Sequence, residues 1–233
     1  MKFLLTAVLM LFSLAAPANA ASFTVSDYKR HIELIGVVQD NALEFAGKIN
    51  ELSIASSKEI TMLINSPGGS VTTGMIMVDS MRQAKARGVR FRCLSTVLAA
   101  SMAYIILAEC DNRYAFSNTL LLWHEISLSV RGAKIRDLYV TLPPILELQD
   151  RVDSDLKSFM QISDSFYQKH SHAETMWSAS ELIDNLDNNG FLRLIDRADF
   201  KTKNLYKYMQ EDMFSFSVGF TVQRILDRMR GLE

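Results

Sequence analysis

A buried strand that runs directly into a turn and a helix limits what this chain can fold into. Residues Glu59 to Asn65 form an apolar run of strand length, and the turn signal Ser66-Pro67-Gly68-Gly69 ends it. A helix is expected next, from about Val71 to Ala86, and Gly88 stands where its C-terminal cap belongs. Strand, turn and helix in this order are the first half of a βαβ unit.

The same alternation extends to both sides of this unit. Further strands are expected over His31 to Val38, Val89 to Leu94, Arg113 to Phe116 and Leu120 to His124. Further helices are expected to begin at Asp40 or Asn41 and near Leu98, the second ending at about Cys110. Strands that alternate with helices form a mostly parallel sheet, so the sequence predicts a single α/β domain.

The pattern changes after His124. Pro143-Pro144 predict a break in any helix that runs through them. Beyond them, apolar residues at three- and four-residue spacing predict a long amphipathic helix from Ile145 to about Lys169. Its apolar stripe must bury against the domain's own sheet or a neighbouring subunit. The last 60 or so residues are expected to form short helices, with one candidate strand over Phe191 to Ile195.

The first twenty residues differ in composition from the rest. They carry a single charge, Lys2, before an apolar run from Phe3 to Ala16, and they close on Ala18-Asn19-Ala20. A charged start, a short apolar middle and an Ala-x-Ala site are typical of a cleavable signal peptide. We therefore expect a signal peptide over residues 1–20, cleaved after Ala20, and a periplasmic or secreted domain over residues 21–233. An uncleaved membrane anchor is the alternative.

The charge balance excludes several classes of partner. Without Lys2, 24 basic side chains remain against 26 acidic ones, so there is no basic excess for binding nucleic acid. No second apolar stretch is long enough to span a bilayer, so no stable membrane span is expected in the mature chain. The two cysteines, Cys93 and Cys110, could form one disulfide in an oxidising compartment or remain two buried thiols.

Three short segments carry residues suited to nucleophilic catalysis. The glycines of the Ser66–Gly69 turn can present a backbone N–H without side-chain obstruction. Ser101, in Ala99-Ala100-Ser101-Met102, is expected in the first turn of a helix, where unpaired N–H groups favour an oxyanion. His124, after Trp123, could accept the serine's proton. Taken singly, these segments could equally be a simple turn, small-residue packing and a core histidine.

Together the three segments resemble those of the Clp-type serine peptidases. The resemblance is carried by Ile64 to Val71 with Gly74-Met75, by Ala99 to Ala103 and by Leu122-Trp123-His124, and continues more loosely through Trp177-Ser178-Ala179. It implies a ClpP/crotonase-like fold, a spiral of βαβ units with a mostly parallel sheet and a protruding helix. The Pro-Gly-Gly and Ala-Ser-Met motifs are shared with acyl-CoA hydratases and signal-peptide peptidases, and the histidine narrows the choice toward Clp.

The resemblance also implies roles for individual residues. Ser101 would be the nucleophile and His124 the general base, with an oxyanion hole from the backbone N–H groups of Gly69 and Met102. Glu174 stands where the family has the orienting Asp, four residues before Ser178-Ala179. His172 is a less favoured substitute. No cofactor or metal is implied.

The expected function is that of an exported serine endopeptidase acting on peptides or unfolded proteins. A homo-oligomer is expected, although Pro143-Pro144 fall in the region that stacks rings in the family, so the ring size is left open. Outside the cytoplasm there is no ATP, so we expect no ATPase partner. The alternatives are a catalytically inactive scaffold, a crotonase-type acyl-CoA enzyme and, least favoured, a serine–lysine peptidase.

Overall fold

The computed structural model describes residues 22–39, 41–127, 134–171, 176–186 and 190–199, and every structural statement below refers to these residues. The strands are β1 (Ser22–Thr24), β2 (His31–Ile35), β3 (Ile60–Ser66), β4 (Phe91–Ala100), β5 (Asn112–Phe116), β6 (Leu120–Leu122), β7 (Met176–Ser178), β8 (Arg193–Ile195) and β9 (Arg197–Asp199). The helices are a 3-10 turn at Tyr28–Arg30, α1 (Asn41–Ala55), α2 (Val71–Ala86), α3 (Met102–Glu109), α4 (Ile135–Met160), α5 (Asp164–Ser171) and α6 (Ala179–Asn185).

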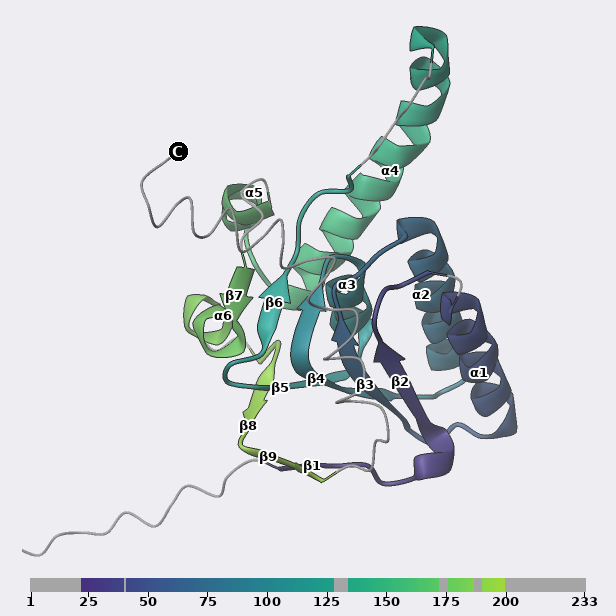
Figure 1. Ribbon diagram of the computed structural model, residues 1–233, viewed down its shortest axis with the longest axis vertical. Helices are drawn as coiled ribbons and strands as arrows, with labels where there is room; N and C mark the ends of the chain where they lie inside the picture. Colours follow the sequence, from purple (N-terminus) through teal and green to yellow (C-terminus); the bar gives the residue numbers. More distant parts are fainter. Residues whose placement is uncertain (1–21, 40, 128–133, 172–175, 187–189, 200–233) are drawn as a thin grey trace, which may run out of the picture.

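The main sheet is mostly parallel, as the sequence predicts. Its strands follow the order β2-β3-β4-β5-β8, all parallel to their neighbours (Figure 1). The long strand β4 pairs with β5 over Arg92–Ser95 and with β6 over Leu98–Ala100. Strand β7 then adds to β6 in the antiparallel direction. The second half of β4 therefore leads directly from the sheet centre to Ser101.

The two faces of this sheet are covered differently. Helices α1 and α2 lie side by side against one face (Figure 1), and their apolar residues join the main core. A smaller apolar cluster, formed around Phe23, Leu63, Leu94 and Ile195, lies under the β1–β9 pair. Strand β3 is buried along its whole length, which explains why its sequence is a continuous apolar run rather than an alternating one.

Helix α4 departs from the sequence prediction at both ends. It runs through Pro143 and Pro144 without a break, ends at Met160 rather than near Lys169, and is followed by the separate helix α5. The expected break was wrong because this half of α4 projects away from the domain (Figure 1), where the side chains of Tyr139 and Val140 are 76% and 73% exposed. Water can reach the carbonyl groups that the two prolines leave without an N–H partner.

The end of α4 is set by local chain geometry. Gln161 follows it in the left-handed conformation, with φ at 54°, and its N–H bonds the Lys157 carbonyl oxygen. A left-handed residue at this place ends a helix. The apolar residues predicted to line one long helix are present, but they are divided between α4 and α5.

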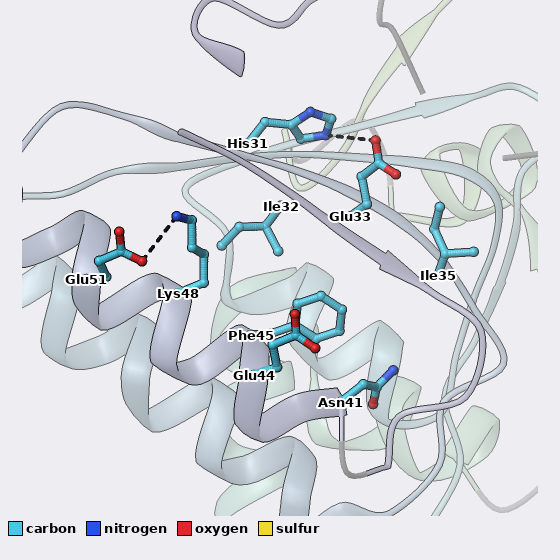
Figure 2. Close-up of a pocket in the computed structure, with 9 residues that line it drawn as sticks. All are labelled: His31, Ile32, Glu33, Ile35, Asn41, Glu44, Phe45, Lys48 and Glu51. Carbon is cyan, nitrogen blue, oxygen red and sulfur yellow. Dashed lines mark hydrogen bonds and ion pairs between the residues drawn. The ribbon is translucent and has the colours of Figure 1, made fainter. Parts of the chain in front are cut away.

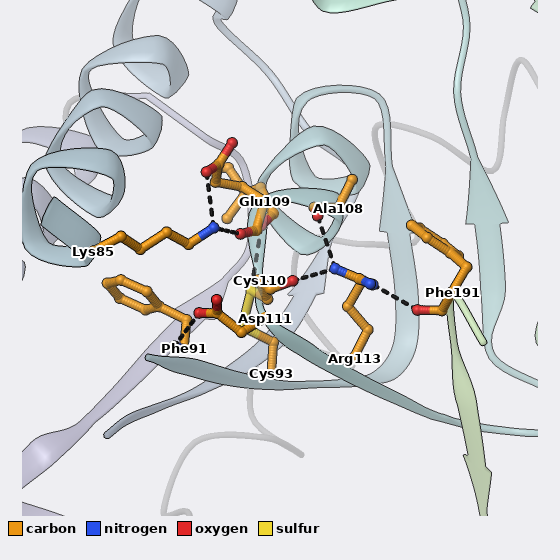
Figure 3. Close-up of a disulfide and its surroundings, with 10 residues drawn as sticks. Lys85, Phe91, Cys93, Ala108, Glu109, Cys110, Asp111, Arg113 and Phe191 are labelled. Carbon is orange, nitrogen blue, oxygen red and sulfur yellow. Dashed lines mark hydrogen bonds and ion pairs between the residues drawn. A yellow bond between two sulfur atoms is a disulfide. The ribbon is translucent and has the colours of Figure 1, made fainter. Parts of the chain in front are cut away.

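The two cysteines form a disulfide (Figure 3), which decides between the two alternatives left open by the sequence. Cys93 lies in β4 and Cys110 directly follows α3, and their Cα atoms are 6.1 Å apart. This separation is within the ordinary range for a bridge. The disulfide closes a loop that contains Ser101, so both ends of the β4–α3 connection are tied together.

No helix in the described ranges is long and apolar enough to cross a membrane. The predicted signal peptide, residues 1–20, lies outside those ranges.

Candidate active site

The Pro-Gly-Gly turn passes very close to the start of α3. A Cβ atom at Gly68 would lie 2.5 Å from the Ala100 carbonyl oxygen and 2.6 Å from the Cβ of Ser101. Gly68 also has a φ of +89°, a conformation that side chains other than glycine rarely adopt. Both the close contact and the positive φ therefore require glycine at this position, and the turn packs directly against the backbone that carries Ser101.

The turn is fixed on its other side by the segment that follows β2. Val38 donates its N–H to the Gly68 carbonyl oxygen at 2.7 Å and accepts from the Ser70 N–H at 2.8 Å. A Cβ at Gly69 would collide with the Val38 carbonyl oxygen. The Ser70 side chain then caps α2 by accepting from Thr73 N–H.

Ser101 stands at the junction of β4 and α3 in a strained backbone conformation. Its φ is 54° and its ψ is −127°, and it occupies the cap position just before the first helical residue. Its N–H donates to the Leu122 carbonyl oxygen of β6 at 2.8 Å, and its own carbonyl oxygen accepts from Tyr104 and Ile105. Strain of this kind costs about 1–3 kcal/mol and persists only where the surroundings impose it. The Ser101 side chain makes no capping hydrogen bond and is half-buried.

The backbone N–H groups of Gly69 and Met102, both near Ser101, have no hydrogen-bond partner among the described residues. Met102 is the first residue of α3, so its N–H belongs to the unpaired group at the positive end of the helix. Its side chain is held against Gly74 of α2, where a Cβ would overlap the Met102 side chain. These are the two donors that the sequence analysis assigns to an oxyanion hole.

His124 lies two residues beyond the end of β6. Because Leu122 pairs with Ala100, the chain that carries His124 leaves the sheet beside the chain that carries Ser101. The imidazole Nδ1 lies 2.5 Å from the Glu125 carbonyl oxygen. A carbonyl partner requires a proton on Nδ1, which leaves Nε2 as the basic nitrogen. In the described part of the chain, no hydrogen bond joins Ser101 to His124.

The two predicted candidates for the orienting acid, Glu174 and the less favoured His172, lie outside the described residues. The helix that follows them is described. Ser178 caps α6 through a capping box with Glu181, whose pKa is lowered by hydrogen bonds from the Ser178 backbone and side chain. Ser178-Ala179 therefore opens a late helix.

The segment around His124 is also held by residues that the sequence analysis missed. Buried Trp123 stacks on Tyr104 of α3 and meets Trp177 of β7 edge to face. The Ile126 N–H donates to Gln149 Oε1 at 2.6 Å. Gln149 is on α4, and nothing in its local sequence indicates a contact with a residue 23 positions earlier.

A separate hollow lies between β2 and α1, away from Ser101 (Figure 2). Three of its lining residues are acidic, namely Glu33, Glu44 and Glu51, and Lys48 pairs with Glu51 at 3.1 Å. The described residues of the predicted site do not line it. Across the described residues, no three His, Cys, Asp or Glu side chains are grouped as metal ligands.

Comparison with known proteins identifies the family of the chain. A sequence model of the Clp protease family matches residues 19–185, which is more than half of the chain. The chain is also similar to ATP-dependent Clp protease proteolytic subunit 3, a chloroplastic protein of Arabidopsis thaliana. The two are 39% identical over 89 residues, which is 37% of this chain and 28% of the relative.

The family match covers the Pro-Gly-Gly turn, Ser101 and His124, as well as strands β2 to β7 of the main sheet. The resemblance predicted from the short motifs is therefore confirmed at the level of the family. Proteins of this family are peptidases. The chain belongs to the Clp protease family.

Proposed function

We propose that this protein is a serine endopeptidase that uses Ser101 as its nucleophile and His124 as its general base. The observation that carries the proposal is the strained backbone at Ser101, held at the start of α3 beside the unpaired N–H groups of Gly69 and Met102. A nucleophile on a strained turn, next to N–H groups that can hold an oxyanion, is an arrangement suited to acyl transfer.

In the proposed reaction, Ser101 Oγ attacks the carbonyl carbon of a peptide bond while His124 Nε2 takes the hydroxyl proton. The Gly69 and Met102 N–H groups stabilise the negative charge on the carbonyl oxygen. The C–N bond then breaks, and the proton passes from His124 to the leaving amine. Water hydrolyses the acyl ester with His124 again acting as base, which frees the new carboxylate and restores Ser101.

Glu174 is proposed as the residue that orients His124, in place of the family's Asp. Its carboxylate would accept from Nδ1, the nitrogen that lies beside the Glu125 carbonyl oxygen in the structure. Catalytic hydrogen bonds are often long or misaligned without substrate and tighten when it binds. The Glu125 contact would be exchanged for one to Glu174 when the site becomes active.

The proposed substrates are peptides or unfolded proteins, taken without an ATPase partner outside the cytoplasm. Two features support export: the composition of residues 1–20, and the Cys93–Cys110 disulfide, which is typical of an oxidising compartment. Members of the Clp protease family form oligomers. We propose a homo-oligomer here too, because apolar side chains such as Tyr139, Val140 and Leu146 are exposed along α4.

The test is covalent labelling of the purified protein with a fluorophosphonate. Wild type should label at one site, and Ser101→Ala should abolish both labelling and peptide hydrolysis, the latter by at least about 10³-fold. His124→Ala should also abolish labelling. Ser127→Ala is the matched control, because Ser127 is exposed and lies only three residues beyond His124. A folded, oligomeric wild type that does not label would contradict the proposal.

One observation favours a second candidate, a catalytically inactive scaffold with the same fold. His124 Nδ1 is already engaged by the adjacent backbone, and Ser101 and His124 are not bonded within the described residues. Such a scaffold would leave Ser101 unlabelled in wild type, so the same experiment separates the two functions.

A further inference from the structure

The chain that carries His124 is anchored on both sides of the histidine. On one side, Leu122 pairs with Ala100 in the sheet and accepts the Ser101 N–H. On the other side, the Ile126 N–H donates to Gln149 Oε1 at 2.6 Å. Residues 123–127 belong to no strand or helix, so the second anchor comes from a side chain rather than from the sheet.

The orientation of the Gln149 amide is set by its other neighbour. Gln149 Nε2 donates to Asp153 Oδ1, one turn further along α4. The same oxygen accepts from the Tyr167 hydroxyl of α5 at 2.8 Å. An ionised carboxylate can only accept, so it must face the amide nitrogen and leave Oε1 toward Ile126.

Tyr167 is buried, with 1% of its surface exposed, so its hydroxyl is a fixed part of this network. Burial is the main cause of its raised pKa, and its hydrogen bond to Asp153 adds to the effect. The hydroxyl donates to an oxygen of Asp153, and burial favours its protonated form. The three side chains join α4 and α5 to the segment that leaves β6.

We propose that Gln149 is a positioning residue for His124, held in its working orientation by Asp153 and Tyr167. The inference rests on the proposed function, because it assigns Gln149 to the general base of that reaction. Gln149 does not touch the reacting atoms. It fixes the backbone two residues after His124, and the imidazole can face Ser101 only if that backbone stays in place.

The first test removes both hydrogen bonds of the amide while keeping its size. Gln149→Met should slow fluorophosphonate labelling of Ser101 and peptide hydrolysis by about tenfold or more, because small displacements of a catalytic group are costly. The loss should be in kcat, with KM unchanged, since Gln149 is not proposed to bind substrate. Glu147→Met is the matched control: the same new side chain at an exposed position of α4 should leave both rates unchanged.

The second test asks whether the hydrogen-bond pattern matters, rather than packing alone. Gln149→Glu should be slow like Gln149→Met, because it sets two carboxylates against each other. Adding Asp153→Asn reverses the polarity of the pair: the new carboxylate accepts from Ile126 and from the new amide, whose oxygen accepts from Tyr167. The double variant should recover labelling to within about twofold of wild type.

The NMR signals of the His124 ring supply a readout that does not require activity. They should shift in Gln149→Met and return to the wild-type position in the double variant. If wild type labels, and Gln149→Met labels at the wild-type rate with unshifted His124 signals, the inference is overturned while the proposed function stands. If wild type never labels, the proposed function fails, and the NMR signals alone decide whether Gln149 positions His124.

Discussion

The two sides of the candidate active site are held by different kinds of interaction. Ser101 is fixed almost entirely by backbone: its N–H bonds β6, its carbonyl oxygen bonds α3, and Gly68 packs against its Cβ. Beyond its backbone pairing at Leu122, the segment that carries His124 is held by side-chain contacts: Gln149 of α4 bonds the Ile126 N–H, and Trp123 stacks on Tyr104 of α3. The serine side should therefore be rigid, and the histidine side should respond to substitutions on α4 and α5.

The largest effects on stability and labelling are expected from a substitution at Gly68, where the Pro-Gly-Gly turn lies against the backbone of Ala100 and Ser101. Gly68→Ala adds a Cβ that overlaps Ala100 and Ser101 at a φ of +89°. Overpacking and an unsuitable φ should together lower the free energy of unfolding by roughly 3–4 kcal/mol. Labelling of Ser101 should fall by more than about 100-fold because the serine is displaced.

Gly36→Ala is the matched control for this change. Gly36 has a similar φ, +81°, but no atom lies within 4 Å of the added Cβ. It should cost only about 1 kcal/mol from the backbone conformation and leave labelling intact. Urea unfolding and labelling rates measure both variants. Equal losses in the two would mean that the close approach to Ser101 does not matter.

A smaller effect is expected when the disulfide is removed. The bridge joins residues 17 positions apart around Ser101, and a loop of this size contributes about 3 kcal/mol. Cys93→Ala with Cys110→Ala should lower the urea midpoint of unfolding accordingly. Labelling of the fraction that remains folded should persist, because the backbone hydrogen bonds of Ser101 do not depend on the bridge.

Wild type treated with a reductant should behave like the double cysteine variant once it is unfolded and refolded. Both cysteines are buried, so reduction of the folded protein should be slow. An unfolding midpoint that neither the substitutions nor reduction change would show that the β4–α3 connection is stable without its covalent tie.

The difference between local and long-range interactions also explains which parts of the fold and site the sequence could predict. Strand β3, the Pro-Gly-Gly turn and helix α2 were predicted closely because apolar period, turn residues and caps are local signals. The start of α3 was predicted wrongly: the helix was expected to begin near Leu98, but β4 continues to Ala100 and α3 begins at Met102, so Ser101 lies at the cap position rather than in the first turn. Leu98, Ala99 and Ala100 are small or apolar residues that fit a buried strand as well as a helix, so their local sequence does not fix the boundary. The family match confirms the predicted resemblance to Clp-type peptidases, and the activity and the roles of Ser101, His124, Gly69 and Met102 remain predictions.

What the sequence missed depends on distant contacts or on solvent. The three-residue pairing of Ser22–Thr24 with Arg197–Asp199 leaves no periodicity to detect. The helix through Pro143 and Pro144 was wrongly divided because the cost of a missing N–H depends on access to water. The hydrogen bond between Gln149 and Ile126 could not be predicted, because the two residues are 23 positions apart and come together only in the folded protein.

The smallest expected effect is a change in the pH dependence of stability, and it comes from His170, which lies on the same side of the site as His124. His170 of α5 packs against the rings of Phe166 and Trp177. Its pKa is lowered from 6.5, mainly by burial and also by Lys169. A lowered pKa means that the folded state favours the neutral ring. Stability from this group is therefore complete above about pH 6.5 and is lost as the pH falls through the folded pKa.

His170→Phe keeps an aromatic ring but cannot titrate, so it isolates this contribution. Wild type should lose more stability than the variant between about pH 7.5 and 5.5, measured by urea midpoints at each pH. His31, whose pKa is also lowered by burial, leaves a residual slope in both proteins. Because His170 is only half-buried, the difference should be small. Identical slopes would mean that α5 and β7 hold their place without regard to the charge on this ring.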